Sequence, residues 1–227
     1  LRKFSYGDGS GLPDNRIESL LFDHNGTLWL GSWNGLARRT ADAATFTPVA
    51  LGDATPRITA LLQSDDGQIW VGSRDGRLWR IAAGDENAIA QPIADAGNAA
   101  IYALLQTGPD QLWAGRANGA EIRAISDGRL LHHLRHQPGN PASLANGEVR
   151  ALLRDRGEQF WVGSYGGGVQ RHNSRNTAFR LRDRHAFAAV DDAPDDLSVR
   201  AIAVLANGRI LLGTQGRGIA VLDAALQ

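Results

Sequence analysis

The 227-residue sequence has no cysteine, no net charge, and no apolar run that approaches the roughly 20 residues needed to span a membrane as a helix. The missing cysteine excludes disulfides and thiol chemistry. Because the charge is balanced and no basic stretch stands out, we expect no nucleic-acid partner, and we expect no membrane contact within this chain. The chain begins at Leu1 without an initiator methionine or a signal peptide, and we expect a processed or excised piece of a longer protein.

A repeat with a period of 41 to 50 residues runs through the sequence. The stretch "IESLLFDHNGTLWLGS" at Ile17 recurs in related form at Ile58, Ile101, Val149 and Val199. In each copy an aromatic residue or its substitute lies twelve residues after the start, and a glycine follows two residues later; these pairs are Trp29 and Gly31, Trp70 and Gly72, Trp113 and Gly115, Trp161 and Gly163, and Leu211 and Gly213. A unit of this length suits four short strands, which is one blade of a β-propeller.

The residues within a unit predict its strands and turns. A short apolar run predicts the first strand, the run containing the tryptophan predicts the second, and weaker third and fourth runs follow. Between the first two strands, Asn25-Gly26, Asp66-Gly67 and Asn207-Gly208 predict type I′ turns, whereas copies three and four lack such a pair and predict another turn type. We therefore predict an all-β fold, a β-propeller of four-stranded antiparallel blades that spans residues 1–227 as one domain, with blades starting near 17, 58, 101, 149 and 199.

The repeated tryptophans are predicted to be wedges between blades, because an indole flanked by aliphatic residues is typical of a core. The glycine that ends the second strand predicts a close neighbouring backbone or a sharp exit of the chain. Two arrangements of the blades remain open. Residues 1–6 resemble a fourth strand and would complete the last blade in a closed five-bladed ring, or the chain is an arc of a larger propeller.

Two stretches resemble the two-component regulator propeller repeat: "GLPDNRIESLLFDHNGTLWLGSWNGLARR", residues 11–39, and "NPASLANGEVRALLRDRGEQFWVGSYGGGVQRH", residues 140–172. The resemblance covers nearly the whole chain and implies the periplasmic, ligand-sensing part of a bacterial membrane-bound receptor. It also implies a histidine kinase or diguanylate cyclase output outside this chain, and oligosaccharides as ligands of several members. Propellers of this family usually have seven blades, so that the arc would belong to a seven-bladed ring.

The candidate binding site lies in loops that do not follow the repeat. The turns between second and third strands share one face with the segments that lead into the first strands, and they combine aromatic, amide and charged residues, a mixture that suits a carbohydrate. The predicted ligand-binding residues are Trp33, Asn34, Arg74, Asp75, Tyr102, Arg116, Asn118, Tyr165, Gln215 and Arg217. The second residues of the first strands are expected near the same mouth: Glu18, Thr59, Tyr102, Arg150 and Arg200. The long loops 135–148 and 182–198 are candidates for a lid or a partner surface.

No catalytic or metal-binding residues are predicted. His132 and His133 point to opposite faces of a strand, and the acidic residues between 191 and 196 lack the spacing of an EF-hand loop. We therefore expect a non-enzymatic segment without a cofactor, whose partners are a small-molecule ligand, the rest of the receptor chain and, in one arrangement, a second copy of itself. The alternatives are a protein-interaction propeller and a propeller lyase or hydrolase.

Overall fold

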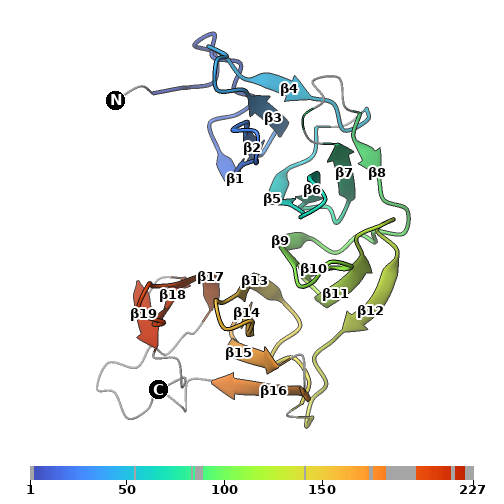
Figure 1. Cartoon of the computed structure of the whole chain (residues 1–227), viewed down its shortest axis with the longest axis vertical. Coiled ribbons are helices and arrows are strands. Elements are labelled where there is room, and N and C mark those ends of the chain that lie inside the picture. The colour runs from blue at the N-terminus through green and yellow to red at the C-terminus, as the bar shows by residue number, and fades with distance from the viewer. Residues whose placement is uncertain are drawn as a thin grey trace.

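The computed structural model describes residues 3–53, 55–82, 84, 89–140, 142–173, 176–182, 198–215 and 218–222, with only the backbone described over 172–182. These residues form five antiparallel sheets (Figure 1). The strands are β1 Ile17–Phe22, β2 Leu28–Ser32, β3 Gly35–Arg39, β4 Thr47–Val49, β5 Ile58–Gln63, β6 Gln68–Ser73, β7 Leu78–Ala82, β8 Gln91–Pro92, β9 Ile101–Gln106, β10 Gln111–Arg116, β11 Gly119–Ala124, β12 Leu130–Leu134, β13 Val149–Arg154, β14 Phe160–Ser164, β15 Gly168–Asn173, β16 Asn176–Arg182, β17 Val199–Val204, β18 Ile210–Thr214 and β19 Ile219–Leu222.

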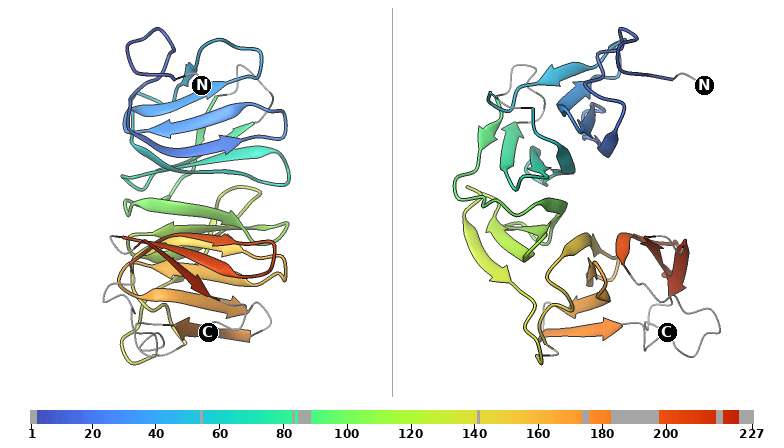
Figure 2. Two further views of the ribbon diagram at one scale, coloured as in Figure 1. Left: turned by 90° about the vertical axis from the view of Figure 1, so that its left-hand side faces the viewer. Right: turned by 180° about the vertical axis from the view of Figure 1, so that it is seen from behind.

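Each sheet is a meander in which consecutive strands pair, and we refer to the sheets as blades 1 to 5 in chain order. The first strands of the blades, β1, β5, β9, β13 and β17, lie along the inner side of an arc, and each contacts the first strand of the next blade. Figure 2 shows the same arc from behind, with its two ends apart. The predicted all-β propeller fold is therefore confirmed, and the first strands of its five blades begin at Ile17, Ile58, Ile101, Val149 and Val199. No helix in the described part of the chain is long and apolar enough to cross a membrane.

The four tryptophans of the repeat are buried between blades, as predicted. Trp29 packs with Ile58 and Ile69 of blade 2, and Trp70 packs with Ile101 and Leu112 of blade 3. Trp113 and Trp161 make the corresponding contacts with blades 4 and 5.

The indole nitrogens are also satisfied within the repeat. Trp29 and Trp161 donate to the carboxylates of Asp23 and Asp155 at 2.9 and 2.8 Å, six residues earlier in the chain. In the fifth copy both members of this pair are leucines, Leu205 and Leu211, so the indole and its acceptor are lost together.

In blades 1 to 4 the glycine of the second strand makes room for the next blade. A Cβ on Gly31 would lie 2.6 Å from Cγ2 of Ile58, and a Cβ on Gly72 would lie 2.6 Å from Cγ2 of Ile101. The close neighbour is therefore the aliphatic residue that starts the next blade, through its side chain at Gly31 and Gly72 and through both side chain and backbone carbonyl at Gly115.

The predicted type I′ turns are wrong. Gly26 has a φ of 78°, but Asn25 does not have a positive φ, and the amide of Gly26 donates to the carbonyl of Asp23. This is a turn followed by one left-handed residue, the three-residue hairpin with a G1 bulge. Copy four uses the same turn with Glu158 at the left-handed position, at a φ of 63°. Its turn is therefore not of type I′, as expected, but it has the same form as the turn of copy one.

The N-terminal segment packs on blade 1. The ring of Phe4 meets that of Phe46 edge to face at 5.5 Å, and both lie in a cluster with Leu30. Residues 3–6 form no strand, and the blade of β17, β18 and β19 has three strands in the described part of the chain. Residues 3–6, part of the segment expected to complete the last blade, therefore lie against blade 1 in this structure, where Phe4 is half-buried, and the five blades form an open arc.

Candidate functional site

One hydrogen bond repeats in every blade and defines the turn face of the propeller. The first residue of the turn between the second and third strands donates its amide to the carbonyl of the residue just before the first strand. The donor–acceptor pairs are Trp33 and Arg16, Arg74 and Arg57, Ala117 and Ala100, Tyr165 and Glu148, and Gln215 and Ser198. The predicted sharing of one face by these two sets of segments is therefore confirmed.

A cavity of about 180 Å³ opens where the inner strands meet this face. Its lining comes from all five blades: Glu18, Arg57, Thr59, Arg74, Tyr102, Arg150 and Arg200. Five of these are the second residues of the first strands, which were expected near this mouth. We call this the axial cavity.

Trp33 stands at the blade 1 side of the axial cavity and is 39% exposed. Its indole nitrogen donates to Oε1 of Glu18 at 2.5 Å, and Nη2 of Arg57 donates to the same oxygen at 2.6 Å. The guanidinium groups of Arg16 and Arg57 lie 4.1 and 4.0 Å from the centre of the indole ring. Glu18 is thus held by two donors, and the indole is engaged by two cations.

Tyr102 lies between two arginines at the middle of the axial cavity. The Nη1 of Arg74 donates to the Tyr102 hydroxyl at 2.5 Å, and the Arg150 guanidinium lies 3.8 Å from the centre of the ring. Arg150 also forms an ion pair with Glu148. Burial raises the pKa of the Tyr102 phenol above its usual value, and this outweighs the opposing effect of the Arg150 charge. The phenol therefore stays a neutral hydrogen-bonding group across the physiological range.

Tyr165 and Gln215 extend the site towards blade 5. Tyr165 is 37% exposed, and the guanidinium groups of Arg150 and Arg200 lie 5.6 and 5.9 Å from its ring centre. Arg200 donates to the side-chain oxygen of Gln215, with its Nε at 3.2 Å. Rings and guanidinium groups thus alternate around the turn face from blade 1 to blade 5.

Arg116 was predicted to bind the ligand, but the structure buries its side chain inside the protein. Its side chain is completely buried, pairs with Glu121 at 2.8 Å, and donates to the carbonyls of Gly76 and Ala99. Burial lowers the pKa of the Arg116 guanidinium, and Glu121 opposes that shift.

The repeat explains this outcome. Arg116 ends β10 at the position occupied in β2, β6 and β14 by the fully buried serines Ser32, Ser73 and Ser164. Glu121 stands at the register position of the buried Ala37 in β3. At these two positions blade 1 has a buried serine and a buried alanine, where blade 3 has a buried ion pair.

Three further predicted residues, Asp75, Asn34 and Asn118, are exposed in the turns, and their hydrogen bonds go to residues that do not line the axial cavity. Asp75 accepts hydrogen bonds from Ser73 and Arg77 in its own turn; burial acts to raise its pKa, but these donors outweigh burial and lower it. Asn34 donates to the carbonyl of Pro13, and the carbonyl of Asn118 meets His133. The last predicted residue, Arg217, lies outside the described residues.

Arg57 is a cavity residue that the sequence reasoning missed. It directly precedes β5, at the position held by Arg16 before β1, so its repeat position was available as a signal. Charged residues line the axial cavity both from the position just before a first strand and from the second position of that strand, and only the second position was predicted.

The other sequence features behave as structural elements where they are described. Leu144 is buried within loop 135–148, and Gln170 fastens that loop by accepting from the amide of Ala145 and donating to the carbonyl of Ser143. Most of loop 182–198, with its acidic residues, lies outside the described residues. In the described part of the chain, no group of three or more histidine, aspartate or glutamate side chains is arranged to hold a metal ion.

Comparison with solved structures agrees with the propeller fold. The extracellular domain of a candidate hybrid two-component system from B. thetaiotaomicron superposes with a TM-score of 0.76 at 18% identity, covering 96% of this chain and 28% of that one. The extracellular domain of a candidate one-component system from the same organism gives 0.70 at 19%, covering 91% and 27%. The chain thus spans a little over a quarter of the length of these relatives.

A catalytically inactive virginiamycin B lyase from Staphylococcus aureus, solved with quinupristin, gives a TM-score of 0.67 at 13% identity, covering 95% of this chain and 73% of that one. At these identities the comparisons define the class of the molecule, a segment of a β-propeller. The two-component regulator propeller family model matches residues 11–34 and 52–75, so the chain carries two-component regulator propeller repeats. No curated protein matches the chain.

Proposed function

We propose that this chain is the ligand-sensing propeller segment of a bacterial membrane-bound signalling receptor, and that it binds a small molecule, an oligosaccharide by class, in the axial cavity. The segment lies in the periplasm and is not itself an enzyme. A histidine kinase or diguanylate cyclase elsewhere in the receptor chain carries the output. The family match and the two extracellular domains of similar fold support this assignment.

The observation that carries the proposal is the convergence of several blades on one cavity. Side chains of β1, β5, β9, β13 and β17 share the lining, so a single ligand contacts several blades at once. Blades in contact only with their neighbours can shift relative to one another, and a ligand that bridges them favours one arrangement over others. Transmission to the receptor chain follows from that change in arrangement.

The lining also suits a sugar. Tyr102 and Tyr165 present rings, and Arg74, Arg150 and Gln215 present hydrogen-bonding groups at the same face. Pyranose rings offer apolar CH faces to aromatic rings and hydroxyls to such groups. The Trp33 indole and the Tyr102 ring already have guanidinium groups against them, so we expect the exposed ring of Tyr165 to stack on the sugar and the Tyr102 hydroxyl to take part in hydrogen bonding.

The test is a thermal-shift screen of the chain against an oligosaccharide panel, followed by titration calorimetry of any hit. A ligand at 100 times its Kd is expected to stabilise the native state by about 2.7 kcal/mol. Tyr102→Ala and Tyr165→Ala are expected to abolish the stabilisation, whereas Tyr6→Ala, at an exposed tyrosine of the N-terminal segment, leaves it unchanged. A panel without any hit would contradict ligand sensing and favour a protein-interaction propeller; turnover of a glycan would instead indicate a lyase or hydrolase.

A further inference from the structure

The charges around the axial cavity do not balance. Four arginines and one carboxylate line it, which leaves an excess of positive charge. Two of the arginines are neutralised, because Arg57 forms an ion pair with Glu18 at 2.6 Å and Arg150 forms one with Glu148.

The other two arginines, Arg74 and Arg200, have neutral acceptors only. Arg74 donates to the hydroxyl of Tyr102, and Arg200 donates to the amide oxygen of Gln215. Within the described residues, neither arginine has a carboxylate within ion-pair distance. Both are exposed at the cavity, one from blade 2 and one from blade 5. Two guanidinium groups that have no carboxylate partner among the described residues therefore face the same small volume.

Glu18 does not cancel this excess for a ligand. Its Oε1 already accepts hydrogen bonds from Trp33 and from Arg57, so the charge of Glu18 is compensated by the Arg57 guanidinium. The Tyr102 phenol remains protonated because its pKa is raised, and it adds no negative charge. An incoming anion therefore meets a cavity of net positive potential.

We infer that the ligand of the axial cavity is acidic, and that its carboxylate or sulfate group binds Arg74 and Arg200. This inference rests on the proposed function and gives the class of saccharide, one that bears an oxyanion. The planar guanidinium group donates two parallel hydrogen bonds to such a group, and hydrogen bonds between two charged partners are about twice as strong as neutral ones. The hydroxyl of Tyr102 and the amide of Gln215, released by the arginines, remain available to sugar hydroxyls.

The experiment is titration calorimetry of the 227-residue chain with matched pairs of oligosaccharides. The acidic members are oligogalacturonates, glucuronate-containing oligomers and sulfated galactose oligomers; their partners are the methyl esters of the two uronates and the unsulfated galactose oligomers. We expect the acidic members to bind about tenfold or more tightly than their neutral partners. Binding of uronates alone identifies carboxylate as the oxyanion recognised, and binding of the sulfated oligomers alone identifies sulfate. High salt, at about 1 M, is expected to remove most of the difference between acidic and neutral members.

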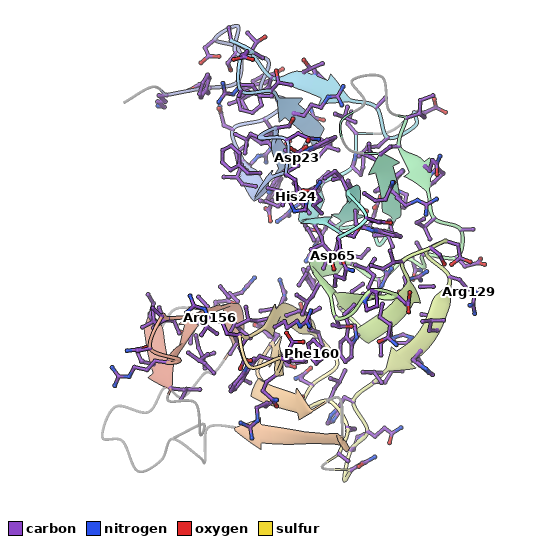
Figure 3. The ribbon with its side chains drawn as sticks, viewed as in Figure 1. Asp23, His24, Asp65, Arg129, Arg156 and Phe160 are labelled. Atoms are coloured by element: carbon purple, nitrogen blue, oxygen red, sulfur yellow. The ribbon has the colours of Figure 1, made fainter. Side chains whose placement is uncertain are left out.

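The variants Arg74→Gln and Arg200→Gln are each expected to weaken binding of the acidic members about tenfold or more, with little effect on binding of the neutral ones. The matched control is Arg129→Gln, at an exposed arginine beside β12 on the outer side of the arc (Figure 3). Thermal unfolding of each variant checks that the chain remains folded.

The outcomes separate the two proposals. Equal binding of acidic and neutral members overturns the acidic-ligand inference while leaving oligosaccharide sensing in place. Equal weakening by Arg129→Gln also overturns it, since the binding would then follow surface charge in general. Failure of every member to bind contradicts both the inference and the proposed function.

Discussion

The tryptophans of this chain fall into two groups whose removal has opposite consequences. Trp70 is completely buried between blades 2 and 3, and its indole nitrogen donates to Ser64 at 3.2 Å. Trp33 is 39% exposed at the turn face. Alanine at Trp70 is therefore expected to weaken the fold, and alanine at Trp33 is expected to affect the site while sparing the fold.

The magnitude for Trp70→Ala follows from its burial. An indole buries about 200 Å², which at about 25 cal/mol per Å² corresponds to about 5 kcal/mol, of which an alanine retains about 1. The resulting loss of about 4 kcal/mol lies within the usual range of about 3–5 kcal/mol for such a substitution. Ser64 keeps its bond to Asp66, so no orphaned hydroxyl adds to the loss. Trp33→Ala is expected to cost about 1 kcal/mol or less.

The assay is urea unfolding followed by far-UV circular dichroism, which does not depend on tryptophan fluorescence. Native chain, Trp70→Ala and Trp33→Ala are compared for the midpoint and the slope of unfolding. A separate early transition in Trp70→Ala would also fit, because blades contact only their neighbours. Equal loss in the two variants, or an unchanged midpoint in Trp70→Ala, would refute the assignment of the repeated tryptophans as wedges.

Three further predictions concern the scaffold and its pH dependence. Gly72→Ala is expected to lower the free energy of unfolding by about 1–3 kcal/mol, because its Cβ would lie 2.6 Å from Ile101. Gly108→Ala is the control, since no atom lies within 4 Å of the added Cβ, and its effect is expected to be near zero. Similar melting temperatures for the two variants would contradict the close packing of blades. Glu158→Gly is expected to raise the free energy of unfolding by about 1 kcal/mol, since glycine adopts its positive φ without strain and its exposed ion pair contributes little; a lowered thermal midpoint would count against this. The raised pKa of Tyr102 contributes to stability below the usual pKa of 10.0, and this contribution is lost as the pH rises through the higher pKa of the folded state. The free energy of unfolding is therefore expected to fall above pH 10.0, and to fall less in Tyr102→Phe. Identical dependence of the urea midpoint on pH in the two proteins would rule this out.

The fold could be predicted because the repeat samples the same physical constraint five times. The fixed spacing of Trp70 and Gly72 from Ile58 indicates a strand pair packed against a neighbour, and the structure has that arrangement in the first four copies. The turn type could not be read in the same way. Asn25-Gly26 suits more than one hairpin, and only the backbone angles show that Gly26 alone is left-handed.

The location of the axial cavity could be predicted from the sequence better than the identity of the residues that line it. The second residues of the first strands were expected at the mouth, and Tyr102, Arg150 and Arg200 lie there, because their strands converge at the inner side of the arc. Arg116 was mispredicted because its place at the end of a strand says nothing about which way its side chain points. Its alignment with the buried Ser73 carried that information.

The most direct test of the account is an NMR titration that follows the arginine Nε–Hε signals while the tightest-binding acidic oligosaccharide is added. We expect the signals of Arg74, Arg150 and Arg200 to shift together with a single dissociation constant, and the signal of Arg129 to stay in place. Shifts confined to arginines outside the axial cavity, or no shift at saturation, would contradict it.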